Sequence, residues 1–299
     1  MGDANGRGGD RLSITIEQLE GPQKITWCTG CGNFGILAAL KKAIVSLDIP
    51  HHQYVLVSGI GCSGKIPHYI NLNSFHTLHG RPIPVATGLK MANHDLRVIV
   101  HTGDGDCLGE GLGHFIHAAR RNVDIAVFIH NNGVNGLTKG QFSPAAPRGY
   151  VSKTSPPPPG SPMEPVNGIA HAIVAGATFV ARGYSGDQKM LTELMKQAIT
   201  HRGFAVVEIL QPCVTWNRKL TWRYFNERTY PLEENGHDAT SREKALAKAL
   251  ENGDRIPIGA FYTGEAPLLA DGLSLPDGRL RDHRTDLARL QELLEEKLV

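Results

Sequence analysis

The sequence lacks the features that mark several large classes of protein. No apolar run approaches the roughly 20 residues that a helix needs to cross a bilayer. The 31 basic and 29 acidic residues leave a formal net charge of only +2, and no basic stripe alternates with aromatic side chains. Since binding to nucleic acid or an anionic membrane depends on concentrated positive charge, we expect neither as a partner.

Cysteine is also sparse, with five in 299 residues, which is too few for a disulfide-stabilised scaffold. The start of the chain, MGDANGRGGDR, is polar and glycine-rich, unlike a signal peptide, and we expect residues 1–24 to form a loose tail. These features favour a cytoplasmic protein. Cysteine pairs there bind metal or carry out redox chemistry more often than they form disulfides.

What the sequence contains is a globular pattern, with 41% hydrophobic and 20% charged residues. Short β-branched and apolar runs that end at Gly, Asn or Pro are typical of buried parallel strands. Apolar residues at helical spacing lie between them. We expect strands at 54–59, 96–103, 124–132 and 204–212, and helices at about 34–47, 108–119 and 187–201. Alternating strands and helices predict an α/β fold with a doubly wound parallel sheet.

The expected domain covers residues 25–216. Within it, the proline-rich segment 154–165 suits neither a helix nor a central strand, so we expect an extended surface connection. After residue 216 the periodicity fades until a charged helix at 282–299. We therefore expect residues 217–299 to form an arm that packs on the domain or on a partner subunit.

The run GDGD at 103–106 comes at the end of one expected strand, and Asn132 ends the next. Neighbouring parallel strands in a right-handed βαβ unit end at the same edge of the sheet, where doubly wound proteins bind ligands. Asp104 and Asn132 should therefore lie together, and their oxygens suit Mg²⁺, which commonly binds one or two protein oxygens plus phosphates. Gly103, Gly105 and Gly109 would let backbone amides approach a diphosphate.

Four cysteines can reach the same edge from three separate segments. Cys62 and Cys213 each follow an expected strand, and Cys28 and Cys31 precede an expected helix. Ligation by cysteine alone suits either Zn²⁺ or an iron–sulfur cluster, and ligand identity cannot choose between them. Cys107, the fifth, is expected to be a small packed residue.

Several motifs together resemble a known family. The GDGD and NN pair resembles the thiamine diphosphate-binding motif. With it, CTGCGNFG, GIGCSGKI, HTLHGRP, TGDGDCLGEG and NNGVNGLTKGQFSP are similar to the β subunit of 2-oxoacid:ferredoxin oxidoreductases, over about residues 25 to 215. The resemblance implies a sheet of the thiamine diphosphate-binding type and a [4Fe–4S] cluster held by Cys28, Cys31, Cys62 and Cys213.

The resemblance also implies the residues of the cofactor site. Asp104, Asn132 and the carbonyl of Val134 would bind Mg²⁺. The thiamine diphosphate would lie among Ile60, Gly61, Cys62, Ser63, His79, Gly103, Gly105, Asp106, Gly136 and Leu137. Ser143 and Pro144 would mark a loop over the site.

The implied reaction is the coenzyme A-dependent oxidative decarboxylation of 2-oxoacids such as pyruvate or 2-oxoglutarate to acyl-CoA and CO₂. Electrons would pass through the cluster to an external ferredoxin, since the chain has no ferredoxin-like CxxCxxC run. The glutamate that activates thiamine diphosphate would come from a companion α subunit, in a heterodimer or a dimer of heterodimers.

Lys65, Leu137 and Lys139 are candidates for contact with the substrate, although either lysine could equally be a solvated surface charge. Two other functions stay open. One is a non-redox thiamine diphosphate decarboxylase or carboligase subunit with a structural zinc site. The other is an electron-transfer or scaffold module that binds a cluster without thiamine chemistry.

Overall fold

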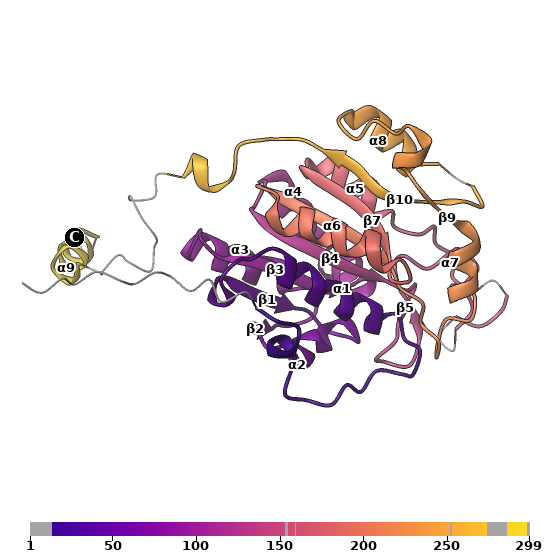
Figure 1. Ribbon diagram of the computed structural model, residues 1–299. Helices are drawn as coiled ribbons and strands as arrows, with labels where there is room; N and C mark the ends of the chain where they lie inside the picture. The colour runs from indigo at the N-terminus through magenta and orange to yellow at the C-terminus, as the bar shows by residue number, and fades with distance from the viewer. Residues whose placement is uncertain (1–13, 153–154, 159, 252, 274–285, 298–299) are drawn as a thin grey trace, which may run out of the picture.

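The computed structural model describes residues 14–152, 155–158, 160–251, 253–273 and 286–297. Its centre is an eight-stranded sheet (Figure 1) in which every neighbouring pair is parallel except β7 with β10. In spatial order the strands are β2 (Asn73–His76), β1 (Tyr54–Ser58), β3 (Arg97–Gly103), β4 (Ile125–Asn131), β8 (Phe204–Leu210), β7 (Phe179–Tyr184), β10 (Ile256–Thr263) and β9 (Thr229–Pro231).

The four strands expected from the sequence, β1, β3, β4 and β8, are contiguous in this sheet. Every residue of β1 and β8 is buried, and β3 and β4 are partly exposed only at their ends. Burial on both faces explains why these strands are continuous apolar runs and do not alternate. The predicted doubly wound α/β fold is confirmed.

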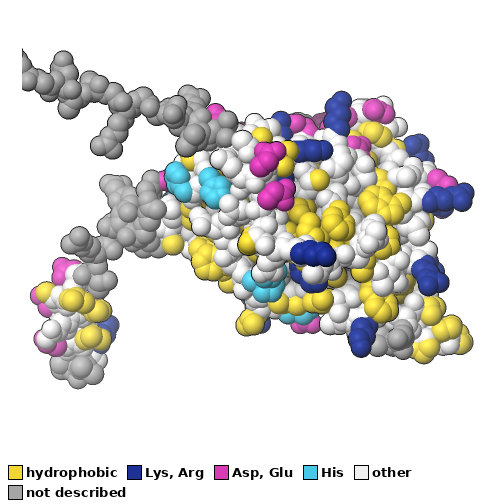
Figure 2. All heavy atoms as spheres, turned by 60° about the horizontal axis from the view of Figure 1, so that its bottom comes forward, with side chains coloured by type: hydrophobic (Ala, Val, Ile, Leu, Met, Phe, Trp, Pro, Cys, Tyr) yellow, Lys and Arg dark blue, Asp and Glu magenta, His cyan; other side chains and the backbone are white. Residues whose placement is uncertain are grey.

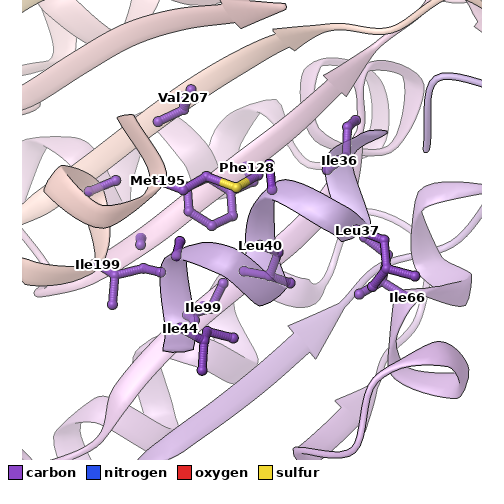
Figure 3. Close-up of a cluster of buried hydrophobic side chains, with 14 of the residues drawn as sticks. Ile36, Leu37, Leu40, Ile44, Ile66, Ile99, Phe128, Met195, Ile199 and Val207 are labelled. Carbon is purple, nitrogen blue, oxygen red and sulfur yellow. The ribbon is translucent and has the colours of Figure 1, made fainter. Parts of the chain in front are cut away.

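Helices cover both faces of the sheet. One face carries α1 (Asn33–Ser46), α2 (Ile66–Tyr69) and α6 (Gln188–Thr200), and the other carries α3 (Pro82–Ala92), α4 (Leu112–Arg120), α5 (Gly168–Ala175) and α8 (Arg242–Ala249). Figure 3 shows the first of the two cores, in which Leu40 of α1 and Met195 of α6 pack over Phe128 of β4. Two separate cores anchor the central strands and hold their ends in place.

The structure also contains elements that the sequence did not predict. Strand β10 extends the sheet to residue 263, so the segment after residue 216 partly continues the sheet, where we expected only an arm. A register shift between Ala260 and Tyr262 interrupts the pairing of β10, which obscures its period-two pattern. Strand β7 and helices α3, α5, α7 (Trp222–Arg228) and α8 were likewise missed.

The remaining elements are short, apart from the last helix. They are the 3-10 turns Glu17–Leu19, His51–Gln53, Ser63–Lys65, Glu233–Asn235 and Ala270–Gly272, the π-helical turn Asp106–Glu110, and the hairpin of β5 (Val134–Asn135) and β6 (Gln141–Phe142). Helix α9 (Leu287–Lys297) buries none of its residues and stands apart from the sheet in Figure 1. Across the described ranges, no helix combines the length and the apolar character that a bilayer crossing requires.

The surface is mixed in character. On the face shown in Figure 2, apolar side chains gather near the middle, while the described Lys, Arg, Asp and Glu side chains lie dispersed around them. Such a face offers apolar area as well as charge to a partner.

Candidate functional site

A cavity of about 190 Å³, open to solvent, lies at the carboxyl ends of the central strands. Every residue expected to contact the cofactor or the magnesium ion lines it. These are Ile60, Gly61, Cys62, Ser63, His79, Gly103, Asp104, Gly105, Asp106, Asn132, Val134, Gly136 and Leu137. They come from the ends of β1, β2, β3 and β4 and from the loops that follow, because parallel neighbours place the residues that follow them on one edge.

Asp104 is the buried carboxylate of this cavity, with 2% of its surface exposed. Its Oδ2 atom accepts hydrogen bonds from the backbone N–H of Gly133 at 2.9 Å and from Ser143 Oγ at 2.5 Å. Burial raises the pKa of Asp104 to about 6, although these hydrogen bonds act in the opposite direction. A carboxylate kept from water in this way gains strongly from a bound cation.

Asn132 lies beside it on the loop that follows β4. Its Oδ1 accepts from the N–H of Val134 at 3.0 Å, and its backbone carbonyl accepts from Asn217 Nδ2 at 2.8 Å. Because Gly133 bonds to Asp104, the loop ties the two candidate ligands together. A carboxylate and a carboxamide oxygen at the wall of one cavity are the hard donors that Mg²⁺ prefers, so the residues present fit that ion.

Two glycines shape the cavity wall. A Cβ added to Gly105 would lie only 2.0 Å from Asn135 Oδ1, and Gly61 has a positive φ of 105° that side chains rarely adopt. A side chain at position 61 would strain the backbone, and one at position 105 would displace the Asn135 side chain. The backbone here can approach a ligand closely, as a diphosphate site needs.

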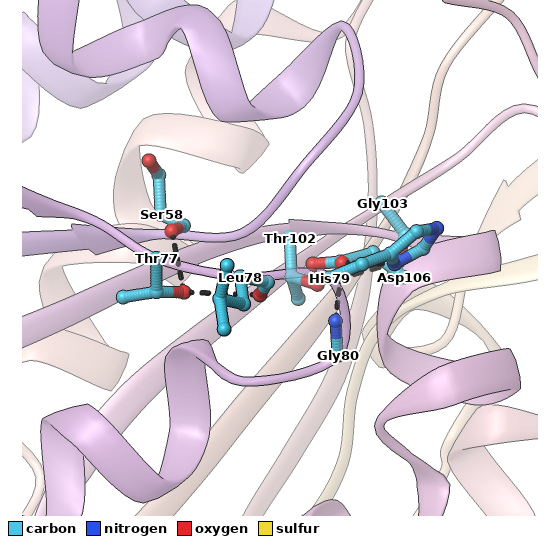
Figure 4. Close-up of polar contacts among 8 residues, drawn as sticks. All are labelled: Ser58, Thr77, Leu78, His79, Gly80, Thr102, Gly103 and Asp106. Carbon is cyan, nitrogen blue, oxygen red and sulfur yellow. Dashed lines mark hydrogen bonds and ion pairs between the residues drawn. The ribbon is translucent and has the colours of Figure 1, made fainter. Parts of the chain in front are cut away.

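Asp106 differs from Asp104 because it binds and orients a histidine of the cavity wall. Figure 4 shows its carboxylate among three donors: Thr102 Oγ1 at 2.6 Å, His79 Nδ1 at 2.7 Å and the N–H of Gly80 at 2.7 Å. Since a carboxylate only accepts, Nδ1 of His79 must carry the proton. Asp106 thus fixes the tautomer and the ring orientation of His79, which lines the cavity.

The four cysteines predicted as ligands come from three separate segments. Cys28 is exposed, Cys31 is buried, and Cys62 and Cys213 are half-buried. Burial, together with smaller contributions from the nearby thiols of Cys213, Cys62 and Cys28, raises the pKa of Cys31 to about 12. Burial also raises the pKa of Cys62, with Cys213 and Cys28 adding to the effect. This mutual influence places the four thiols in one region of the molecule.

The cysteine thiols lie against one wall of the cavity. A Cβ added to Gly136 would lie 3.7 Å from Cys62 Sγ and 3.9 Å from Cys213 Sγ, and both Gly136 and Cys62 line the cavity. By ligand type, four thiols from three segments suit an iron–sulfur cluster or zinc. Over the residues that the structure describes, no three His, Cys, Asp or Glu side chains gather closely enough to hold a single metal ion.

Comparison with known proteins agrees with this arrangement. Residues 48–209 match the family model of the thiamine pyrophosphate enzyme C-terminal TPP-binding domain. Residues 213–274 match the model of the C-terminal part of the pyruvate ferredoxin oxidoreductase beta chain. The 2-oxoacid:ferredoxin oxidoreductase β subunit from Saccharolobus solfataricus is 51% identical over 251 residues, which cover 80% of this chain and 82% of that protein.

The chain belongs to the family of 2-oxoacid:ferredoxin oxidoreductase β subunits. A further relative, the 2-oxoglutarate synthase subunit KorB of Methanocaldococcus jannaschii, is 39% identical over 83% of this chain and 90% of its own length. Among solved structures, 2-oxoglutarate:ferredoxin oxidoreductase from Magnetococcus marinus with 2-oxoglutarate, coenzyme A and succinyl-CoA bound is 35% identical. It has a TM-score of 0.84 and covers 96% of this chain and 93% of that chain.

The three residues of this chain that are candidates for substrate contact do not all reach the cavity. Leu137 lines it and is 49% exposed. Lys65 instead donates to Thr26 Oγ1 at 3.1 Å, on the side of the cysteine pair. Lys139 is outside the cavity lining and has a positive φ of 77° in the turn before β6. Of the three, only Leu137 is brought to the cavity.

The cavity also contains residues that the sequence analysis did not assign. Asn135, Gln141 and Gln211 line it, and Ser143 bonds directly to Asp104. The loop motif around Ser143 was noted, but nothing in its spacing indicated that contact. Cys107, as expected, is packed in the second core.

Proposed function

We propose that this chain is the β subunit of a 2-oxoacid:ferredoxin oxidoreductase that converts 2-oxoacids and coenzyme A to acyl-CoA and CO₂. One observation carries the proposal. The cavity that holds Asp104 and Asn132 shares the wall formed by Gly136 and Cys62 with a group of four thiols. A site for decarboxylation and a site for electron removal are thereby neighbours.

Magnesium would be held by the Asp104 carboxylate, the Asn132 amide oxygen and the carbonyl of Val134. The burial of Asp104 and its raised pKa support this assignment. Gly105 and Gly61 leave room for the diphosphate beside that ion. Thiamine diphosphate, when bound, supplies the electron sink for the carbanion left by loss of CO₂.

The chain's own residues would orient the reactants. Nδ1 of His79 donates its hydrogen bond to Asp106. The Nε2 atom is therefore the one available for hydrogen bonds in the cavity that the ring lines. Leu137 contributes an apolar wall on the side where a 2-oxoacid side chain would enter. Both 2-oxoglutarate and pyruvate fit this chemistry, and names of the relatives include 2-oxoglutarate.

Cys28, Cys31, Cys62 and Cys213 would hold one [4Fe–4S] cluster that passes electrons to ferredoxin. The raised pKa values of Cys31 and Cys62 mean that binding the cluster displaces protons from buried thiols. Their position against the cavity wall supports short-range electron removal from the cofactor.

A companion α subunit would complete the site and supply the activating glutamate. Exposed apolar side chains surround the cavity and the thiols: Leu78 follows β2, Leu137 lines the cavity, and Val214 adjoins Cys213. Such side chains commonly mark protein–protein contact. We expect an αβ unit, single or doubled.

Anaerobic purification with the co-purifying subunit tests the proposal. We expect iron and acid-labile sulfide in cluster stoichiometry, Mg²⁺-dependent binding of thiamine diphosphate, and reduction of ferredoxin that depends on a 2-oxoacid and coenzyme A. Stoichiometric zinc with no iron would instead support the non-redox thiamine enzyme. Iron without thiamine diphosphate binding would support an electron-transfer module.

A further inference from the structure

Gln211, the residue directly after β8, contacts both candidate sites with one side chain. We propose that Gln211 is a positioning residue that couples the magnesium site to the iron–sulfur cluster. One end of its carboxamide holds the amide of Asn132, and the other end donates a hydrogen bond to the sulfur of Cys31. The inference rests on the proposed function and concerns how its two sites are held together.

The contacts of Gln211 use its whole carboxamide. Its Oε1 accepts from Asn132 Nδ2 at 2.7 Å. Its Nε2 donates to Cys31 Sγ at 3.4 Å and to the carbonyl of Pro212 at 2.9 Å. Only 1% of the residue is exposed, so water cannot replace these partners. Both hydrogens of the amide and its oxygen are therefore used inside the protein.

The orientation of this amide is set by a backbone group at the far end of the network. The N–H of Val134 donates to Asn132 Oδ1, which turns Asn132 Nδ2 toward Gln211. Gln211 must then present its oxygen to Asn132 and its nitrogen to Cys31. Reversing either amide would oppose two donors in a buried place, which is strongly unfavourable. The network thus runs in one direction, from Val134 to Cys31.

The backbone around Gln211 is equally constrained. A Cβ added to Gly32 would lie 2.9 Å from Gln211 Cγ, so only glycine allows the start of α1 to come this close. The N–H of Gly32 donates to the carbonyl of Pro212 at 3.1 Å, and the N–H of Gln211 donates to the carbonyl of Asn131 at 2.8 Å. The side chain is therefore held between α1 and β4 as a rigid link.

Each end of the link has a chemical consequence. An N–H donor to a ligating sulfur stabilises the added negative charge of a reduced cluster, which raises its reduction potential. A partner that orients a ligating carboxamide typically changes metal affinity by about 10- to 100-fold. Gln211 should accordingly affect two measurable properties that belong to two different cofactors.

The test uses Gln211→Met in the anaerobically purified holoenzyme, because methionine has a similar volume and lacks both contacts. We expect the ratio of reduced to oxidised cluster at a fixed potential to fall about tenfold, which equals a shift of about 59 mV for one electron. We also expect the affinity for Mg²⁺, titrated in the presence of thiamine diphosphate, to fall about tenfold or more. Redox titration followed by electron paramagnetic resonance and calorimetry measure the two effects.

A second variant separates the two ends. Gln211→Glu keeps an oxygen for Asn132 but replaces the N–H donor to sulfur with a carboxylate, whose charge also opposes the added electron, so the potential should fall by more than in Gln211→Met while Mg²⁺ affinity falls by less. The matched control is Gln188→Met. Gln188 is partly buried beside α1 and donates only to the carbonyls of Gly35 and Ser185. This control should change neither property.

The outcomes are distinguishable. The coupling alone is overturned if the wild-type holoenzyme has the cluster and binds Mg²⁺ with thiamine diphosphate, but Gln211→Met leaves the reduction potential and the Mg²⁺ affinity unchanged. The coupling alone is also overturned if Gln188→Met shifts the reduction potential and the Mg²⁺ affinity as much as Gln211→Met does. A wild type without the cluster, or without Mg²⁺-dependent binding, overturns the proposed function and the coupling with it.

Discussion

Replacing Asp104 by asparagine should stabilise the metal-free protein while destroying its cofactor site. Burial raises the pKa of Asp104 from 3.8 to about 6. At about 1.36 kcal/mol for each unit of pKa, the shift of roughly two units corresponds to about 3 kcal/mol. The amide oxygen introduced by Asp104→Asn can still accept from Gly133 and Ser143, since both donors meet the same oxygen of Asp104.

The sign follows from proton linkage. Between pH values near 4 and near 6 the folded chain holds the Asp104 proton that the unfolded chain has released, so the free energy of unfolding falls as pH rises. Above the folded pKa the loss is complete. Asp104→Asn does not titrate there, and its advantage should be about 3 kcal/mol near pH 8 and should disappear near pH 4.

Urea unfolding of chelator-treated protein across this pH range measures the difference. In wild type, Mg²⁺ with thiamine diphosphate at about 100 times its dissociation constant should restore about 2.7 kcal/mol, whereas the variant should show no such gain. The control is Asp238→Asn, because Thr240 and Lys244 lower the pKa of Asp238 to about 2, which predicts a loss of stability at neutral pH. An Asp104→Asn protein no more stable than wild type near pH 8 would refute the reasoning.

Three further sets of substitutions test the site. Cys213→Ser should lose most of its iron and sulfide with little change in circular dichroism, whereas Cys107→Ala, which alters a packed core residue, should keep both. Gly105→Ala should weaken thiamine diphosphate binding about tenfold because its Cβ would displace the Asn135 side chain, which lines the cavity. Gly113→Ala, with nothing within 4 Å, should be neutral or stabilising by up to about 1 kcal/mol in thermal unfolding. Asp106→Asn should destabilise the fold by about 1–3 kcal/mol in urea and lower kcat, since three donors lose a charged acceptor.

The parts of the site that the sequence predicted are those set by chain topology. Asp104 and Asn132 were placed together because β3 and β4 are parallel neighbours and residues that follow such strands meet at one edge. Cys62 and Cys213 were placed by the same reasoning, whereas Cys28 and Cys31 were placed by the helix that follows them. These positions depend on where each strand ends, which hydrophobic patterns report, and on consecutive strands being neighbours, which the right-handed βαβ unit predicts.

The parts that escaped prediction depend on side-chain orientation. Asp106 belongs to the same GDGD run as Asp104, yet its carboxylate bonds to Thr102, His79 and Gly80, which come from other segments. Gln211 stands two residues before Cys213 with no motif of its own, and its contacts depend on a backbone donor at Val134. Spacing along a sequence carries no information on which of several buried donors an oxygen will meet.

Burial at this edge of the sheet links cofactor binding to stability. Asp104 and Cys31 both have raised pKa values because the fold removes them from water. Burial therefore favours the protonated form of each group in the metal-free chain. A bound cation would displace the proton or, where the group is already ionised, stabilise its negative charge. The apolar packing of the central strands stabilises the sheet strongly enough to carry these unfavourable groups at their tips. Loading with Mg²⁺ and a cluster should consequently release protons and stabilise the chain together, because both effects arise from the same buried acids.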